Sequence, residues 1–299
     1  MHSIYVDAEF TDDERRAKLY EGDLFVYSPR PSTLALTEFA AEMARAAFAP
    51  LDPETAQFHM AVEDYAALLA ELKPRFIHHP ESKRLIQEML VDFGCDPEQV
   101  YFDVPRMRSS TSDEYLTTGI AFAFHPHRDT WYSAPYTQLN WWLPIFAISE
   151  DNGLAFHPKY WHTPVQNSSR VYNYAEWNAT SRKIAATQIG VDTRIQPKPE
   201  EEVELMPQIR PIVKPGGIIL FSGAQLHSSV PNTSGRTRFS IDLRTVHLGD
   251  TESGWAAPNI DSECTGTTMG DYLRVSDLEH IPSEVVEAHD TPRPASEPV

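Results

Sequence analysis

The hydrophobic and polar positions of this sequence follow two different periods. In the first hundred residues, apolar side chains recur every three or four positions, which is the spacing of one face of an α-helix. Pro31 and Ser32 mark the start of the first such segment, and Gly94 follows the last one. The pattern therefore predicts a helical layer within residues 1–99, with helices over residues 31–49, 60–72 and 81–94.

From residue 100 onward the period changes to two. Short runs rich in β-branched and aromatic residues are separated by Gly, Pro, Asn and Ser, which is typical of strands joined by turns. Helices do not alternate with these strands, so a parallel α/β sheet is not expected. The chain is predicted to be mainly β, with strands over residues 100–108, 118–127, 137–148, 153–158, 216–223 and 236–248.

A long insert over residues 160–210 interrupts the predicted strands. It contains Tyr172, Tyr174 and Trp177 and a predicted helix near residues 174–189. Inserts of this length in a compact domain are often lids or binding loops, so we expect it to cover a substrate. We expect one domain over residues 1–299, made of the helical layer, a β core over 100–248 and a C-terminal extension over 249–299 whose last part, 291–299, is disordered.

Side chains alternate between the two faces of a strand, and this alternation sorts the candidate functional residues. In the run from residue 118, the phenyl rings of Phe122 and Phe124 share one face, which we expect to pack on the helices. A polar face costs free energy unless a ligand or water needs it, so the opposite faces are predicted to line an internal site. These polar faces carry Ala121, Ala123, His125, His127 and Asp129 on the first strand, and Arg236, Arg238, Ser240, Asp242 and Arg244 on the last, opposite Phe239, Ile241 and Leu243.

Composition and charge limit the possible partners. The 299 residues are 41% hydrophobic, enough for a sizeable core. Asp and Glu outnumber Lys and Arg by 43 to 25, and the net charge of -18 would repel nucleic acids and anionic lipid surfaces. Cys95 and Cys264 are too few for a disulfide framework, and neither a basic leader nor an apolar membrane span is present. We expect a cytoplasmic protein without nucleic-acid or membrane partners, of open oligomeric state.

The stretch HPHRD, residues 125–129, permits three metal sites. As HxHxD it is similar to the metallo-β-lactamase zinc signature, which continues with a histidine where this chain has Thr130. As a cupin HxH motif it lacks the following Glu. The third interpretation combines His127 and Asp129 with a distant histidine in a two-His, one-carboxylate site, which leaves three positions open on Fe(II). His79 and Glu81, a second candidate pair, are typical of a helix cap.

A family resemblance favours the third interpretation. The motifs HRD, EDNGLAFHP, PGGIILFSGAQLHSS and RTRFS, in this order over about residues 100–248, resemble the phytanoyl-CoA dioxygenase family of Fe(II)- and 2-oxoglutarate-dependent oxygenases. The resemblance implies a double-stranded β-helix (jelly roll, cupin-like) core with flanking helices. It further implies His127, Asp129 and His227 as iron ligands, Arg238 as the partner of the distal 2-oxoglutarate carboxylate, and Ser229 as a further cosubstrate contact. Trp142 is expected to pack beside the cosubstrate, or else to be an ordinary core tryptophan.

Other residues near these motifs have more than one interpretation. Arg236 is a rival for the cosubstrate, although the RxS form of Arg238 and Ser240 favours Arg238. Gln138 and Asn140 share the face of Trp142 and are expected to hydrogen-bond the cosubstrate or substrate, or else to satisfy one another. Substrate contacts are expected from Arg106, Arg108, His125, Trp131 and Tyr132, together with the aromatic residues of the insert.

The reaction implied by the resemblance is the oxidation of a C–H bond with Fe(II), 2-oxoglutarate and O2, releasing succinate and CO2. Hydroxylation is the simplest outcome and dealkylation or desaturation remain open, while an acid at position 129 argues against halogenation. We expect a small polar metabolite or natural-product intermediate. A coenzyme A thioester is disfavoured because the acidic chain has no basic cluster in its sequence. A zinc hydrolase using His125, His127 and Asp129 and a non-catalytic jelly-roll binding protein remain alternatives.

Overall fold

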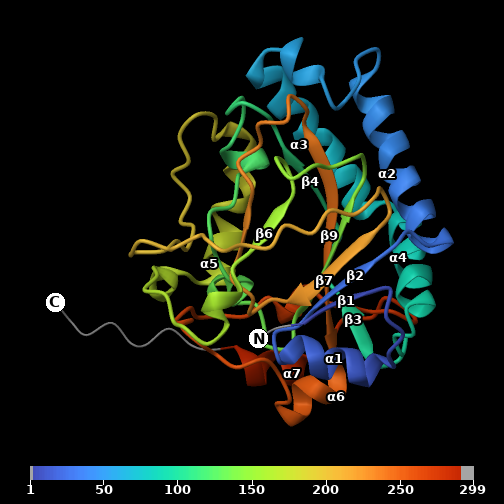
Figure 1. Cartoon of the computed structure of the whole chain (residues 1–299), viewed down its shortest axis with the longest axis vertical. Helices are drawn as coiled ribbons and strands as arrows, with labels where there is room; N and C mark the ends of the chain where they lie inside the picture. The colour runs from blue at the N-terminus through green and yellow to red at the C-terminus, as the bar shows by residue number, and fades with distance from the viewer. Residues whose placement is uncertain (1–2, 291–299) are drawn as a thin grey trace.

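The computed structural model describes residues 3–290, so the tail predicted to be disordered, 291–299, lies outside the described residues. Within that range the strands form one eight-stranded mixed sheet and one two-stranded sheet (Figure 1). The large sheet contains β1 (Ile4–Val6), β2 (Leu24–Tyr27), β3 (Val100–Phe102), β4 (Arg106–Ser110), β5 (Leu139–Pro144), β7 (Ile218–Ser222), β9 (Arg238–His247) and β10 (Leu273–Arg274). The small sheet pairs β6 (Leu154–Phe156) with β8 (His227–Ser229).

Helices surround the large sheet. The three predicted near the N-terminus are confirmed as α2 (Pro31–Phe48), α3 (Val62–His78) and α4 (Pro80–Asp92). In α2 the buried residues Leu36, Ala40, Ala44 and Phe48 are four positions apart, so they form one face that packs in the main core. The cap predicted before α4 is confirmed, because His79 Nδ1 accepts from the Glu81 N–H at 3.1 Å. The other helices are α1 (Asp12–Tyr20), α5 (Tyr174–Ala179), α6 (Leu248–Ser253) and α7 (Ser283–His289).

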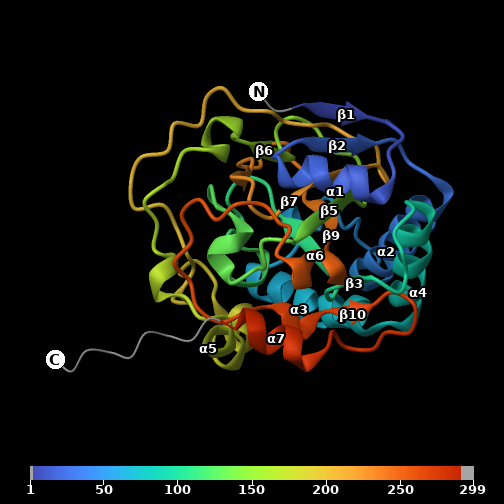
Figure 2. The same ribbon diagram turned by 90° about the horizontal axis from the view of Figure 1, so that it is seen from below.

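Strand β9 runs through the centre of the large sheet. It pairs with β5 on one side and with β3 and β4 on the other. The predicted alternation along it is confirmed, since Phe239, Ile241 and Leu243 are fully buried in the core shared with the helices. The intervening polar residues face the opposite side of the sheet. Figure 2 shows that α2 and α4 lie on one side of the molecule and that α5, in the insert, lies on the other.

The predicted strand over 118–127 is wrong. Gly119–Ala121 form a 3-10 helix, and only His127 retains an isolated strand-like pairing. Gly119 has φ +60° and a Cβ there would lie 2.3 Å from the Ala185 carbonyl oxygen, so the chain turns sharply where a strand was expected. As a consequence Phe122 and Phe124 do not pack on the helices, as was predicted, but line an internal cavity.

Other elements differ in length from the predictions. The predicted strand over 100–108 is divided into β3 and β4 around Pro105, which has no N–H for a sheet hydrogen bond. The helix predicted near 174–189 is shorter, with α5 followed by a 3-10 helix, Arg182–Thr187. The strands β1, β2, β8 and β10 were not predicted. Cys95 and Cys264 are both free, and no helix within residues 3–290 has the length and apolar content needed to cross a membrane.

Candidate metal centre

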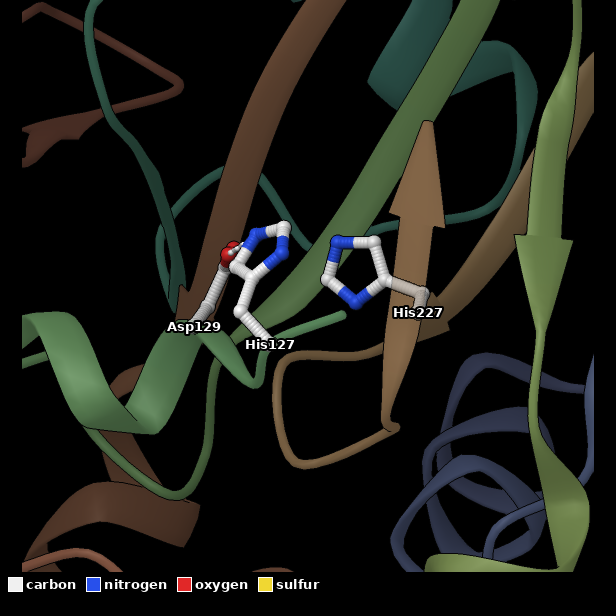
Figure 3. Close-up of side chains that lie close together, drawn as sticks. All are labelled: His127, Asp129 and His227. Atoms are coloured by element: carbon white, nitrogen blue, oxygen red, sulfur yellow. Dashed lines mark ion pairs between the residues drawn. The ribbon is translucent and has the colours of Figure 1, made fainter. Parts of the chain in front are cut away.

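Backbone pairing brings two distant histidines together. The N–H of His127 donates to the carbonyl of His227 at 2.9 Å, and the N–H of His227 donates back at 3.0 Å. Two residues later the Asp129 N–H donates to the Gly223 carbonyl at 2.9 Å. The potential ligand atoms of His127, Asp129 and His227 lie within 4.8 Å of one another, and all three residues are buried (Figure 3). The structure thus assembles the three predicted ligands in one place.

Hydrogen bonds orient both imidazoles. His127 Nδ1 lies 2.8 Å from the carbonyl oxygen of His125, and His227 Nδ1 lies 3.0 Å from that of Gln225. A carbonyl oxygen can only accept, so each Nδ1 carries a proton, and in the neutral ring Nε2 then keeps its lone pair. Burial and the neighbouring His127 lower the pKa of His227 to about 4, which keeps this ring neutral near pH 7. Both rings are therefore prepared to bind a metal through Nε2.

Asp129 offers one carboxylate oxygen to the metal site that the two imidazoles face. Its Oδ2 accepts from Gln138 Nε2 and Asn140 Nδ2, both at 2.8 Å, while its Oδ1 lies 3.5 Å from His127 Nε2. Burial raises the pKa of Asp129, but the Arg244 guanidinium and the two histidines hold it well below its usual range. The aspartate is therefore ionised, with one oxygen held by amides and the other free for a cation. Two imidazoles and one carboxylate oxygen match a facial Fe(II) site.

Gln138 and Asn140 follow the second of their two interpretations, in which the polar side chains satisfy one another. Gln138 Nε2 lies 2.8 Å from Asn140 Oδ1, and both amide groups also donate to Asp129. The Tyr272 hydroxyl donates to Gln138 Oε1 at 2.8 Å and fixes the orientation of that amide. These side chains hold the carboxylate in place.

A cavity of about 200 Å³ opens beside the three ligands, on the polar face of the large sheet. Among the predicted contacts, Trp131 and His125 do not line it. Trp131 is fully buried and its Nε1 donates to Asp261 at 2.6 Å, while His125 Nε2 lies 2.7 Å from the Pro197 carbonyl oxygen of the insert. The expected substrate contacts of these two residues are thus replaced by internal ones. The predicted residues that do line the cavity are Arg106, Arg108, Tyr132, Gln138, Asn140, Trp142, Ser229 and Arg238.

Arg238 lies buried at the cavity wall without a carboxylate within ion-pair distance in residues 3–290. Its Nη1 donates to the carbonyls of Asn152 at 3.0 Å and Gly153 at 3.2 Å, and its guanidinium lies 5.5 Å from the centre of the Trp142 ring. Burial lowers its pKa to about 10. Arg236, the predicted rival, precedes β9, is exposed and lies 3.5 Å from Glu54. Its predicted inward orientation is therefore wrong.

Buried polar atoms without partners concentrate at the cavity. In the described part of the chain, six buried side-chain nitrogen or oxygen atoms have no hydrogen-bond partner, and five of them belong to cavity-lining residues. Buried polar groups are normally paired, so this concentration indicates a space for a polar ligand. The five atoms are Ser109 Oγ, Trp177 Nε1, Arg238 Nε, Arg244 Nε and Thr268 Oγ1.

Sequence reasoning missed several lining residues because only the packing of distant elements brings them to the cavity. Lys73 belongs to α3 and donates to the Ile120 carbonyl. Arg194 lies in the insert, and its guanidinium forms an ion pair with Asp192 at 2.6 Å. Phe124 stacks on the His127 ring, with centroids 4.9 Å apart. The aromatic residues of the insert that were expected near a substrate, Tyr172, Tyr174 and Trp177, do line the cavity.

A comparison of sequences with family models agrees with this geometry. The model of the phytanoyl-CoA dioxygenase (PhyH) family matches residues 26–240. The chain belongs to the phytanoyl-CoA dioxygenase family. The resemblance predicted from the motifs is thereby confirmed, and the match extends from β2 through α2, α3 and α4 into β9. Membership places the chain in a family whose cofactors and cosubstrates are iron, 2-oxoglutarate and O2.

Several solved structures are similar to this chain. EvdO2 from Micromonospora carbonacea var. aurantiaca, complexed with 2-oxoglutarate, has 14% identity and a TM-score of 0.38, and the similarity covers 58% of this chain and 62% of EvdO2. AviO1 from Streptomyces viridochromogenes Tue57 has 16% identity and a TM-score of 0.39, covering 85% of this chain and all of AviO1 (100%). The epimerase SnoN, in complex with Fe3+, alpha-ketoglutarate and nogalamycin RO, has 14% identity and a TM-score of 0.38, covering 78% and 83%.

No curated protein matches this chain. The identities and TM-scores of the solved structures are low, so the family assignment rests on the family model that matches residues 26–240.

Proposed function

We propose that this protein is an Fe(II)- and 2-oxoglutarate-dependent dioxygenase that oxidises a C–H bond of a small molecule and releases succinate and CO2. Hydroxylation is the simplest reaction of this kind. The observation that carries the proposal is the meeting of His127, Asp129 and His227, whose ligand atoms lie within 4.8 Å of one another beside a cavity. Iron held there with 2-oxoglutarate and O2 supplies the oxidising chemistry.

The residues of the chain have separate tasks in this proposal. His127 and His227 hold the metal through Nε2, and Asp129 holds it through Oδ1, because its Oδ2 is occupied by amide donors. Arg238 binds the distal carboxylate of 2-oxoglutarate, since its buried Nε lacks a partner among the described residues and a guanidinium matches two carboxylate oxygens. Trp142 packs against this cosubstrate, and Ser229 contacts it from β8.

The same proposal includes the finer description of the fold. We infer one oxygenase domain in which the large sheet and the β6–β8 pair form the two walls of a double-stranded β-helix, with the metal between them. The N-terminal helices stabilise the outer face of the large sheet through the shared core. The insert acts as a lid, because Tyr172, Tyr174 and Trp177 line the cavity and exclude water from the reacting centre.

A spectroscopic titration tests this function. Anaerobic addition of Fe(II) and 2-oxoglutarate should give a weak visible charge-transfer band, because the keto acid chelates the metal. His227→Ala should lose the band. A wild-type protein that binds both components to saturation without a band would contradict the proposal.

The two alternatives are not favoured. A zinc hydrolase would need His125 beside His127 and Asp129, but His125 Nε2 contacts the Pro197 carbonyl and His227 completes the ligand group instead. A non-catalytic binding protein would have no need of three ligand atoms with their free lone pairs turned to one point.

A further inference from the structure

The charge inside the cavity is opposite in sign to that of the whole chain. The chain has a formal net charge of -18, yet among residues 3–290 seven Lys and Arg side chains line the cavity against two Asp side chains. The basic cluster that the sequence did not reveal is assembled from α3, β4, β9 and the insert. Cations gathered in a partly buried space are unfavourable unless anions accompany them.

Some of these cations already have partners. Arg194 is held by Asp192, and Arg106 and Arg244 share Asp103, which lies 3.1 Å from Arg244. Arg238 has the role of binding 2-oxoglutarate in the proposed function. Arg182 donates to the Asn178 side chain at 3.1 Å. Lys73 and Arg108 interact electrostatically with each other and remain incompletely balanced.

Lys73 approaches the cavity from α3 with a neutral partner. Its ammonium group donates to the Ile120 carbonyl, and no carboxylate of the described residues lies within ion-pair distance of it. Burial, and then the nearby Arg108, lower the pKa of Lys73 to about 7. A bound anion would restore the charge that this environment disfavours.

Arg108 faces the same region from β4. Its Nε and Nη2 both lie 3.2 Å from Asp242 Oδ2, but that carboxylate is shared with Arg244 at 3.7 Å. The Arg108 side chain is 31% exposed, so a ligand can reach it. Nη1 makes no hydrogen bond to residues 3–290 and can donate to a ligand.

An aromatic wall connects this pair of cations to the metal centre. The Arg108 guanidinium lies 5.2 Å from the centre of the Phe124 ring, and the same ring stacks on the ligand His127 at 4.9 Å. A single phenyl ring therefore separates the cation from the metal ligand. A molecule anchored at Arg108 can lie along Phe122 and Phe124 with its carbon atoms toward the metal.

We propose that the substrate carries an oxyanion, a carboxylate or a phosphate, and that Arg108 and Lys73 bind it and determine specificity. This inference rests on the proposed function, because the anion is assigned to the substrate of the same cavity. A guanidinium and an ammonium group together supply several charge-assisted donors to such a group.

Calorimetry on the loaded protein tests the inference. The full chain is saturated anaerobically with Fe(II) and 2-oxoglutarate, so that Arg238 is occupied, and is then titrated with phenylacetate, phenyl phosphate or neutral phenylacetamide. At least one anionic probe should bind, and the neutral amide should not. The anionic probe with the higher affinity identifies the anionic group of the substrate as a carboxylate or a phosphate. Arg108→Gln and Lys73→Met should each weaken binding of that probe at least tenfold while the charge-transfer band persists.

Matched variants separate this inference from the proposed function. Arg236→Gln removes an exposed cation beside β9 and should leave probe binding unchanged, while Arg108→Lys and Lys73→Arg should recover part of it.

Equal binding of anionic and neutral probes, or unchanged binding in the Gln and Met variants, overturns the inference alone. Loss of 2-oxoglutarate binding in Arg108→Gln overturns it also, because Arg108 would then hold the cosubstrate. If Arg108→Gln does not fold, probe binding by Lys73→Met, a change at a part-exposed residue, tests the inference in its place. A missing band in the wild type rejects the proposed function itself.

Discussion

The two faces of β9 differ completely although their residues alternate along one strand. Phe239, Ile241 and Leu243 are fully buried against the helical side, where removal from water stabilises the fold. Arg238 and Asp242 line the cavity on the other side, where burial of charge costs free energy. One strand thus contributes Phe239, Ile241 and Leu243 to the core and Arg238, Asp242 and Arg244 to the cavity wall. Changes on the two faces should therefore have separable effects.

The largest effect should come from the metal ligand on β8. His227→Ala removes one of three ligands, and we expect loss of stoichiometric iron binding and of succinate formation in a protein that remains folded. Metal analysis and circular dichroism measure the two properties. His280→Ala, at an exposed histidine, is the matched control. Iron retained at full stoichiometry in His227→Ala would contradict the assignment.

The apolar face of β9 should affect stability alone. Phe239 packs against Phe48 and Phe146, with ring centroids 5.9 Å away in both pairs. Phe239→Ala should lower the free energy of unfolding by about 3–5 kcal/mol, because it removes buried surface and leaves a cavity. Urea denaturation measures this loss. The folded fraction should keep its wild-type affinity for 2-oxoglutarate, and a large change in that affinity would show that the two faces are coupled.

A change on the polar face of β9 should weaken ligand binding without lowering stability. Arg238→Gln should weaken 2-oxoglutarate binding by about 2–3 kcal/mol, the contribution of a charge-assisted pair of hydrogen bonds. The free energy of unfolding without ligand should stay the same or rise, because a buried guanidinium with only carbonyl partners is removed. Calorimetry and urea denaturation test both signs. A large loss of stability with unchanged cosubstrate affinity would make Arg238 a structural residue.

The same contrast between faces explains what the sequence revealed. Helical periodicity predicted α2 and α4 because their apolar residues repeat regularly, and the alternation along β9 predicted the inward orientation of Arg238. The run around Phe122 and Phe124 also alternates, but the positive φ of Gly119 and the close approach of the insert there depend on tertiary contacts. Local patterns cannot distinguish such a segment from a strand.

The electrostatics of the cavity were still less accessible from the sequence. Net charge sums over the whole surface, whereas Lys73 and Arg108 come together only when α3 packs beside β4. Likewise, Gln138 and Asn140 share a strand face with Trp142, but their contact with Asp129 requires the loop that follows His127 to fold back onto β5. The meeting of His127, Asp129 and His227 was predictable because the three residues lie in motifs that resemble those of the family.

A smaller effect is expected from the amides behind Asp129. Gln138→Leu removes one of the donors to Oδ2 and leaves Asn140 as the other amide that orients the carboxylate. Iron affinity should fall by roughly tenfold, at the low end of the effects of residues that orient metal ligands. Competition with a chelator measures the affinity. Thr137→Val, which alters a neighbouring buried hydroxyl bonded to Thr251, is the control and should leave the iron affinity unchanged.

The smallest effect is the pH dependence of anion binding by Lys73 and Arg108. Burial, and then Arg108, lower the pKa of Lys73 to about 7, and bound anion should raise it again. Binding of a carboxylate probe should therefore be tightest below pH 7, where Lys73 is already protonated, and should weaken by at most roughly tenfold from pH 6 to pH 8. Arg108, which faces Lys73 from β4, stays charged in this range, and Ile120 contributes only a carbonyl. Phenylacetate is ionised throughout this pH range, so the slope of probe affinity against pH comes from a group of the protein. Lys73→Met should bind more weakly and lose the slope, and a slope that persists in this variant would assign the titration to another group.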